Sequence, residues 1–216
     1  MHSSIPNASS DAATSGRPGS TPADSGTSPR ETVTRLVLSL GFAAKEHITL
    51  AQKLVADPPR EDFDRSVVLP PGRNRDHHLV VLRKCIRQLR SLDMEADALL
   101  NELGQPGSQA ETTARRRRLA DIDAGIQRLL PRFCFSWHVL MGIALLGWHL
   151  RERMQTCREQ IAAGAIPADG KGGPDKNPLL RLRLLEELVR QPAPEFDARM
   201  VHIRELVAQL DAQRLG

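Results

Sequence analysis

Two histidine–glutamate pairs have a spacing that could place metal ligands on one face of a helix. His149 precedes Glu152 by three residues, and His202 precedes Glu205 by the same interval. Metal sites in helical bundles use the order Glu-x-x-His on facing helices. Both pairs here run in the reverse order, and Arg151 lies within the first. We therefore expect exposed or hydrogen-bonded histidines, and the same expectation covers His47, His77, His78 and His138.

The three cysteines are the only candidate strong nucleophiles. Cys85, Cys134 and Cys157 are odd in number and lack CxxC spacing, which predicts free thiols and a reducing compartment such as the cytoplasm. Three basic residues within two positions of Cys85 could lower the pKa of its thiol, but we expect a structural or incidental thiol there. Apolar neighbours should raise the pKa of the Cys134 thiol. The sequence contains no Gly-rich phosphate loop, GxSxG motif or zinc-ligand spacing. We predict no catalytic residue, no metal and no cofactor.

One dense basic run could bind an anion. It comprises Arg115, Arg116, Arg117 and Arg118, in a chain with 30 basic and 26 acidic residues and a net charge of +4. Nucleic-acid-binding proteins usually concentrate their basic residues more strongly, so a nucleic-acid partner is disfavoured. The run falls early in a predicted helix, where its side chains point in several directions. We expect a solvated patch that also meets acidic helix faces, with an anionic lipid as the alternative.

The longest uncharged segment spans residues 133–150, FCFSWHVLMGIALLGWHL. It contains both tryptophans of a chain that has no tyrosine and only 3% aromatic residues. Trp137 and Trp148 are eleven residues apart, so a helix places them on one face. The segment could lie in a bundle core, in the groove of a partner or in a bilayer. Its candidate contact residues are Phe133, Trp137, Leu145 and Trp148.

The composition of this segment favours a buried helix. Eighteen residues span roughly 27 Å as a helix, slightly less than the ~30 Å hydrocarbon core of a bilayer. Flanking arginines and interfacial tryptophans are typical of membrane helices. Against this, two histidines, Ser136 and two glycines lower the hydrophobicity of the segment. A central bundle helix is also apolar on all sides, so we expect core packing first, partner binding second and membrane insertion third.

Helix-capping signals and apolar stripes define the predicted helices before the apolar segment. Ser28-Pro29-Arg30-Glu31 is a capping box, and the stripe after it predicts one helix to about residue 56. Gly41 lies inside this helix, either to permit a close helix crossing or without any role. A connector with a short extended piece at 66–69 precedes a helix over 75–103.

The predicted 75–103 helix has an unusual charge order. Its polar face is basic in the first half and acidic in the second, with Asp93 interrupting the apolar stripe. The helix dipole prefers the reverse order. Either the face is solvated or it recruits a partner.

The later helices follow from the same signals. Ser108-Gln109-Ala110-Glu111 is a second capping box, and the helix that it starts reaches Pro131. Because no good N-cap precedes Pro131, we predict a kink rather than a break, with the helix continuing to about residue 163. Two shorter helices should follow, the first starting at Asn177-Pro178 and the second using Phe196 to Leu210.

These elements predict an all-α fold, a five- or six-helix bundle behind a disordered N-terminal tail. A core built on aliphatic residues suits helices better than sheets. The predicted units are a Ser/Thr/Pro/Gly-rich tail (1–27), a main bundle (28–163), a Gly/Pro linker (164–178) and a C-terminal helical hairpin (179–216). The tail has too few apolar residues to offset the entropy of ordering.

The first functional hypothesis is a non-catalytic helical interaction protein: an adaptor, a complex subunit or an exported effector. It would bind protein partners, or a second copy of itself, through amphipathic helix faces of the coiled-coil kind. The alternative is a membrane-active secreted effector or translocator that inserts 133–150. The Ser-rich tail resembles type III export signals in composition, which allows export into a host cell without a cleaved signal peptide. A metal-binding or enzymatic bundle is the third hypothesis.

Overall fold

The computed structural model describes residues 28–164 and 177–215. The predicted disordered tail and most of the predicted linker lie outside the described residues. Within the described ranges every regular element is a helix, which confirms the predicted all-α class.

The described chain forms eight α-helices and one 3-10 helix. In order they are α1 (Pro29–Leu38), α2 (Ala43–Leu54), α3 (Phe63–Ser66), α4 (Arg75–Leu103), α5 (Gln109–Leu129), η1 (Leu130–Phe133), α6 (Trp137–Ala162), α7 (Pro178–Val189) and α8 (Ala193–Leu215). Both predicted capping boxes are present, at Ser28 and at Ser108.

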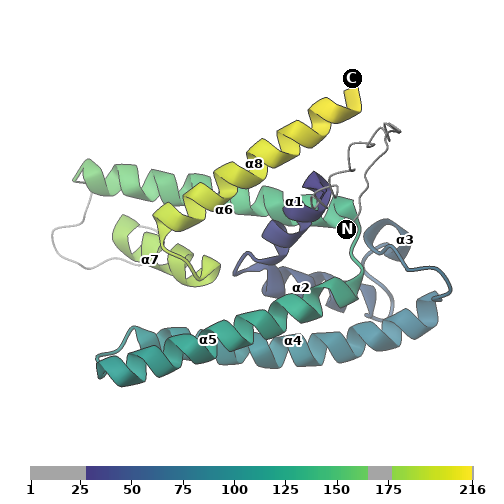
Figure 1. Cartoon of the computed structure of the whole chain (residues 1–216), viewed down its shortest axis with the longest axis horizontal. Helices are drawn as coiled ribbons and strands as arrows, with labels where there is room; N and C mark the ends of the chain where they lie inside the picture. The colour runs from purple at the N-terminus through teal and green to yellow at the C-terminus, as the bar shows by residue number, and fades with distance from the viewer. Residues whose placement is uncertain (1–27, 165–176, 216) are drawn as a thin grey trace, which may run out of the picture.

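The helices form a bundle with two long pairs on opposite sides (Figure 1). On one side α4 and α5 form a hairpin, and α2 packs on α4. On the other side α6 and α8 pack against each other, and α1 contacts both. The core between them is closed by large side chains with at most 1% of their surface exposed, among them Phe42, Phe133, Phe196, Leu82 and Met200.

The predicted single helix over 29–56 is wrong, because the chain turns between α1 and α2. The turn runs from Ser39 to Phe42 and passes close to the end of α7. A Cβ atom on Gly41 would lie 2.2 Å from the carbonyl oxygen of Val189 and 2.8 Å from Cβ of Arg190. Gly41 therefore permits a close crossing, the first of the two roles considered for it.

The predicted kink at Pro131 is also wrong, because the chain leaves the helical path there. Pro131 lies in the 3-10 helix η1, which ends at Cys134 in a left-handed conformation (φ 55°). The cap of the next helix is Ser136, whose side-chain oxygen accepts a hydrogen bond from the Val139 amide. The N-cap is thus inside the apolar segment rather than before Pro131, and α6 begins only at Trp137.

The turn between η1 and α6 is held by the connector before α4. Val67 and Phe135 form an isolated antiparallel bridge, so the predicted extended piece is present at its centre. The Val68 amide donates to the Cys134 carbonyl at 2.8 Å, and the Ser136 amide donates to the Ser66 carbonyl at 2.9 Å. The short helix α3 that precedes this bridge was not predicted.

An ionic cluster joins the acidic half of α4 to α2 and α7. Arg190 donates to Asp93 at 2.5 Å and to Asp97 at 2.7 Å, with only 6% of its side chain exposed. Lys45 reaches the same two carboxylates at 2.8 and 2.6 Å. Burial alone would raise the pKa of Asp97, but the hydrogen bonds from Lys45 and Arg190 lower it. The acidic side chains lie in the second half of α4, where the helix dipole disfavours negative charge. Cations from α2 and the end of α7 offset this unfavourable interaction.

No helix within the described ranges combines the length and the apolar character that crossing a membrane requires.

The close approach at Gly41 predicts a large effect of a single methyl group. Gly41→Ala should lower the free energy of unfolding by about 1–3 kcal/mol, because the backbone of α7 cannot move away without disturbing Arg190. Gly142→Ala is the matched control, since nothing lies within 4 Å of a Cβ atom there. It should be neutral or stabilising by up to about 1 kcal/mol. Urea unfolding followed by circular dichroism measures both, and equal stabilities would contradict the role given to Gly41.

Candidate interaction groove

The histidine–glutamate pairs do not converge on a common point. His149 and His202 are both exposed, and His202 Nδ1 lies 4.0 Å from the Glu205 carboxylate. In the described ranges no group of three His, Cys, Asp or Glu side chains is placed to hold a metal ion.

Two other histidines are buried in the core. His47 is 1% exposed, its Nδ1 donates to the Ala43 carbonyl at 2.8 Å, and its ring packs against Phe133. Burial lowers the pKa of His47 to about 4, more than the hydrogen bond to Ala43 raises it. His78 donates from Nε2 to the Phe133 carbonyl at 3.1 Å, while its Nδ1 is buried without a hydrogen-bond partner. Both rings are therefore expected to be neutral and to act as packing groups.

The basic residues near Cys85 in the sequence do not lower the pKa of its thiol. Its basic neighbours in the sequence are exposed, whereas Cys85 faces the core and is fully buried. Burial raises the pKa of the Cys85 thiol, and burial likewise raises that of Cys134, as predicted. Neighbours along a helix do not share a face, so the cations do not surround the thiol.

The arginine run lies on α5 and meets the acidic half of α4. Arg115 Nε is 3.4 Å from Glu102, and Arg118 pairs with Glu95. Arg116 and Arg117 are exposed. Half of the candidate basic patch is thus engaged within the chain.

The apolar segment contributes both to the core and to the surface. Phe133, a candidate contact residue, is fully buried beside His47 and is not available to a partner. Along α6, one face is buried and includes Leu140, Ile143 and Leu150. A second face carries Trp137 and Trp148, both half-buried, and Leu145, which is 56% exposed. This second face is the part of the segment that is open to a partner.

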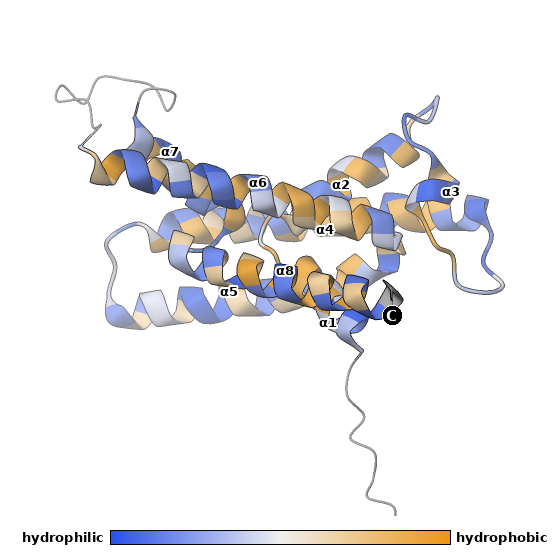
Figure 2. Ribbon diagram, turned by 90° about the horizontal axis from the view of Figure 1, so that it is seen from above, coloured by the Kyte–Doolittle hydropathy of each residue, from blue (hydrophilic) through white to orange (hydrophobic). Residues whose placement is uncertain are grey.

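The second face of α6 forms one wall of a groove with a volume of about 580 Å³. The other wall is α8, and the N-terminal turn of α1 lies at one end. In Figure 2 the ribbons of α6 and α8 both carry hydrophobic residues in this region. We call this site the tryptophan groove; its lining residues are Arg30, Trp137, Met141, Ala144, Leu145, Trp148, His149, Glu152, Ile203, Arg204, Val207, Leu210 and Asp211.

The two walls run antiparallel. Asp197, near the start of α8, accepts a hydrogen bond from Arg151 at 2.5 Å. One turn later, Met200 lies against Gly147, where a Cβ atom would be 2.8 Å from the methionine methyl group. Later residues of α8 therefore lie beside earlier residues of α6, and the groove has a Trp148 end and a Trp137 end.

An arginine covers each tryptophan. The Arg30 guanidinium lies 5.0 Å from the ring centroid of Trp137, and that of Arg204 lies 4.8 Å from the ring of Trp148. Arg151 approaches Trp148 more distantly, at 5.9 Å. Such cation–π contacts contribute about 0.5–1 kcal/mol at exposed sites. They also hold the long arginine side chains in place at the groove.

Four charged residues at the groove have no ion pair within the described ranges: Arg30 and Arg204 are basic, and Glu152 and Asp211 are acidic. Their side chains are exposed. Each end of the groove thus offers one charge of each sign: Glu152 and Arg204 beside Trp148, and Arg30 and Asp211 toward Trp137.

A larger cleft of about 970 Å³ between the end of α4 and α7 has a different character. Most of its charged lining residues are paired inside the chain: Arg190 and Lys45 with Asp97, and Arg183 with Glu187 at 3.1 Å. Counting ion pairs between described residues alone, this cleft presents fewer unpaired charges to a ligand than the tryptophan groove does.

Sequence patterns identified one wall of the groove but not the other. The shared face of Trp137 and Trp148 was predicted from their spacing. For α8, the sequence predicted one apolar stripe and gave no sign that its two halves differ. The first half of the stripe is fully buried (Phe196, Met200 and Ile203), whereas Val207 and Leu210 are half-buried at the groove. No sequence pattern indicated that Arg30 and Arg204 would lie at the groove, because their positions depend on contacts between distant segments.

Comparison of this chain with protein-family models, with curated proteins and with solved structures found no match.

The buried His47 predicts a pH dependence of stability. Its pKa is about 4 in the folded protein and near 6.5 in the unfolded chain, so the unfolded state binds the extra proton as pH falls between these values. Stability should be greatest above pH 6.5 and should fall toward pH 4, by on the order of 3 kcal/mol from His47.

His47→Leu removes this titration while keeping an apolar side chain in the core. Urea unfolding at a series of pH values should show a shallower decline for the variant than for the natural protein. Some slope will remain, because burial also lowers the pKa of His78. Identical slopes would contradict the assignment of a neutral, buried His47.

Proposed function

We propose that this protein is a non-catalytic helical interaction protein that binds a partner protein through the tryptophan groove. The observation that supports the proposal is the combination at one open groove of both tryptophans, the exposed Leu145 and two arginines that have no acidic partner among the described residues. Tryptophan and arginine are the residues most enriched at the energetic centres of protein interfaces.

The shape and pattern of the groove favour a helical partner. Trp137, Met141, Leu145 and Trp148 follow the i, i+4, i+8, i+11 pattern of one helix face. On the other wall, Ile203, Val207 and Leu210 follow an i, i+4, i+7 pattern. Ile203 is fully buried, whereas Val207 and Leu210 are half-buried. An amphipathic helix laid between these stripes would contact both, as in other complexes in which a helix occupies a groove. The charges of both signs at the groove ends favour a partner that also carries both signs.

The adaptor, complex-subunit and exported-effector roles all use such a surface. Membrane insertion of 133–150 is the competing proposal, and it would have to withdraw the buried Phe133 and the Ser136 cap from the core. The groove, by contrast, is accessible without any rearrangement of the fold.

Site-specific photo-crosslinking tests the proposal in cells of the source organism. A photoreactive phenylalanine analogue at position 145 should yield a discrete protein adduct, because Leu145 projects at the groove. The same analogue at position 94 is the matched control, since Met94 is 66% exposed on α4, away from the groove. Adding Arg204→Glu to the position-145 protein should reduce the adduct several-fold. The absence of a protein adduct at 145, or identical adducts at both positions, would contradict the proposal.

A further inference from the structure

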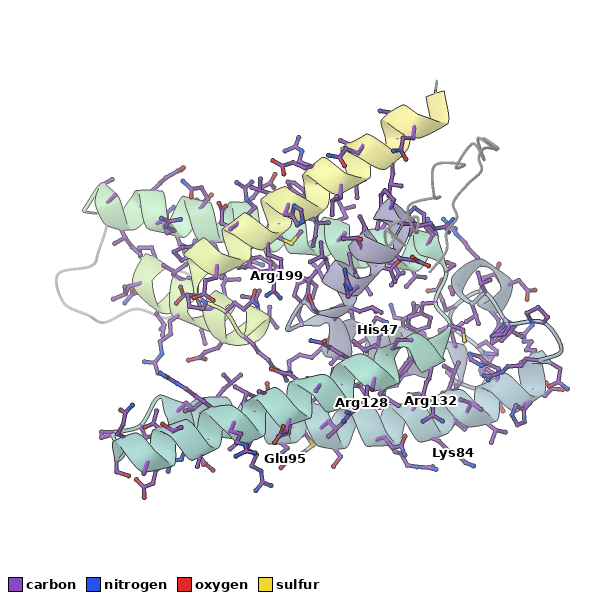
Figure 3. All side chains as sticks on the ribbon, viewed as in Figure 1. His47, Lys84, Glu95, Arg128, Arg132 and Arg199 are labelled. Carbon is purple, nitrogen blue, oxygen red and sulfur yellow. The ribbon has the colours of Figure 1, made fainter. Side chains whose placement is uncertain are left out.

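We infer that the tryptophan groove binds a second copy of this chain, in a two-fold symmetric dimer. This inference rests on the proposed function, because it names the partner of the same surface. It starts from the exposed Leu145 and from the four groove charges that have no ion pair within the described ranges. Figure 3 draws the described side chains as sticks, with α6 and α8 in the colours of Figure 1.

A surface that binds a copy of itself must be complementary to itself. In a two-fold interface the same residues face each other from both copies, so every protruding group needs a recess and every charge needs its opposite. Leu145 is a protruding apolar side chain with 56% of its surface exposed, and the groove beside it is an apolar recess. The protruding side chain and the recess that could receive it from a second copy therefore lie on the same face of the molecule.

The charges satisfy the same condition. In one two-fold arrangement α6 lies antiparallel on α6 of the other copy, which exchanges the two ends of the groove. Arg30 then faces Glu152 of the second copy, and Asp211 faces Arg204. In the other arrangement α6 of one copy lies on α8 of its mate without exchange of ends. Glu152 then faces Arg204, and Arg30 faces Asp211.

Both two-fold arrangements thus bring each unpaired guanidinium to an unpaired carboxylate. A partner helix with a single sign of charge would leave two like charges opposed at the groove, which is unfavourable. The equal numbers of both signs, with one of each at each end, favour a second copy over a purely acidic or purely basic partner.

A charge-segregation experiment on the full chain tests the inference by sedimentation velocity from about 1 to 200 µM. One variant, Arg30→Glu with Arg204→Glu, makes all four positions acidic. The other, Glu152→Arg with Asp211→Arg, makes all four basic. The natural chain should dimerise with increasing concentration. Each variant alone should dimerise at least tenfold more weakly, and an equimolar mixture should form the mixed dimer.

Two controls separate the groove from other causes. Arg116→Glu with Arg117→Glu makes the same change in net charge at exposed positions on α5 and should leave dimerisation unchanged. Leu145→Asp should abolish the mixed dimer when placed in both variants. Circular dichroism and thermal unfolding establish that each variant is folded.

A natural chain that stays monomeric at 200 µM would overturn the inference. Variants that each dimerise as strongly as the natural chain would also overturn it, because the contact would then lie elsewhere. A monomeric chain that still crosslinks a different protein at position 145 would leave the proposed function in place while removing the second copy as its partner.

Discussion

The arrangement of the helices depends on Arg190, which leaves the end of α7 in a left-handed conformation (φ 57°) and places its guanidinium between Asp93 and Asp97 of α4. Arg190 is nearly buried, and Lys45 binds the same two carboxylates. Charged side chains from α2, α4 and the end of α7 therefore meet at one point. Removing one member of such a cluster leaves a buried charge without compensation. Gly41 allows the α1–α2 turn to approach the backbone beside Arg190. Since α8 begins only three residues after Arg190, this joint sets where α8 lies, and α8 is the second wall of the tryptophan groove.

The parts of this fold that were predicted correctly are those set by local chemistry. The capping boxes at Ser28 and Ser108 and the helix over 75–103 follow from side chains within a few residues of one another. The errors arose where distant segments decide. The break at Gly41 depends on the backbone of Val189, and the break after Pro131 depends on pairing between Val67 and Phe135. No pattern within either helix reveals these contacts.

The site divides in the same way. The common face of Trp137 and Trp148 follows from helical spacing, but the arginines that cover them come from α1 and α8. The arginine run of α5 was expected to meet acidic helix faces, and it pairs with the acidic half of α4. The cations that α2 and the end of α7 bring to the same half of α4 were not predicted. Among the residues that the structure describes, the tryptophan groove has four charged side chains without an ion pair, whereas most charges of the cleft beside α7 are paired. Charges that have no ion pair in the described part of the chain make the groove the better candidate for a contact with another molecule.

We propose that the tryptophan groove contacts protein rather than lipid. The tryptophans provide a direct measurement, because the chain has two of them, both in the groove, and no tyrosine. We would record the emission maximum and the acrylamide quenching of the purified protein with and without anionic phospholipid vesicles. We expect vesicles to change neither the emission maximum nor the quenching. A blue shift with loss of quenching on adding vesicles would contradict a protein contact at the groove and would favour insertion of the segment 133–150 into a membrane.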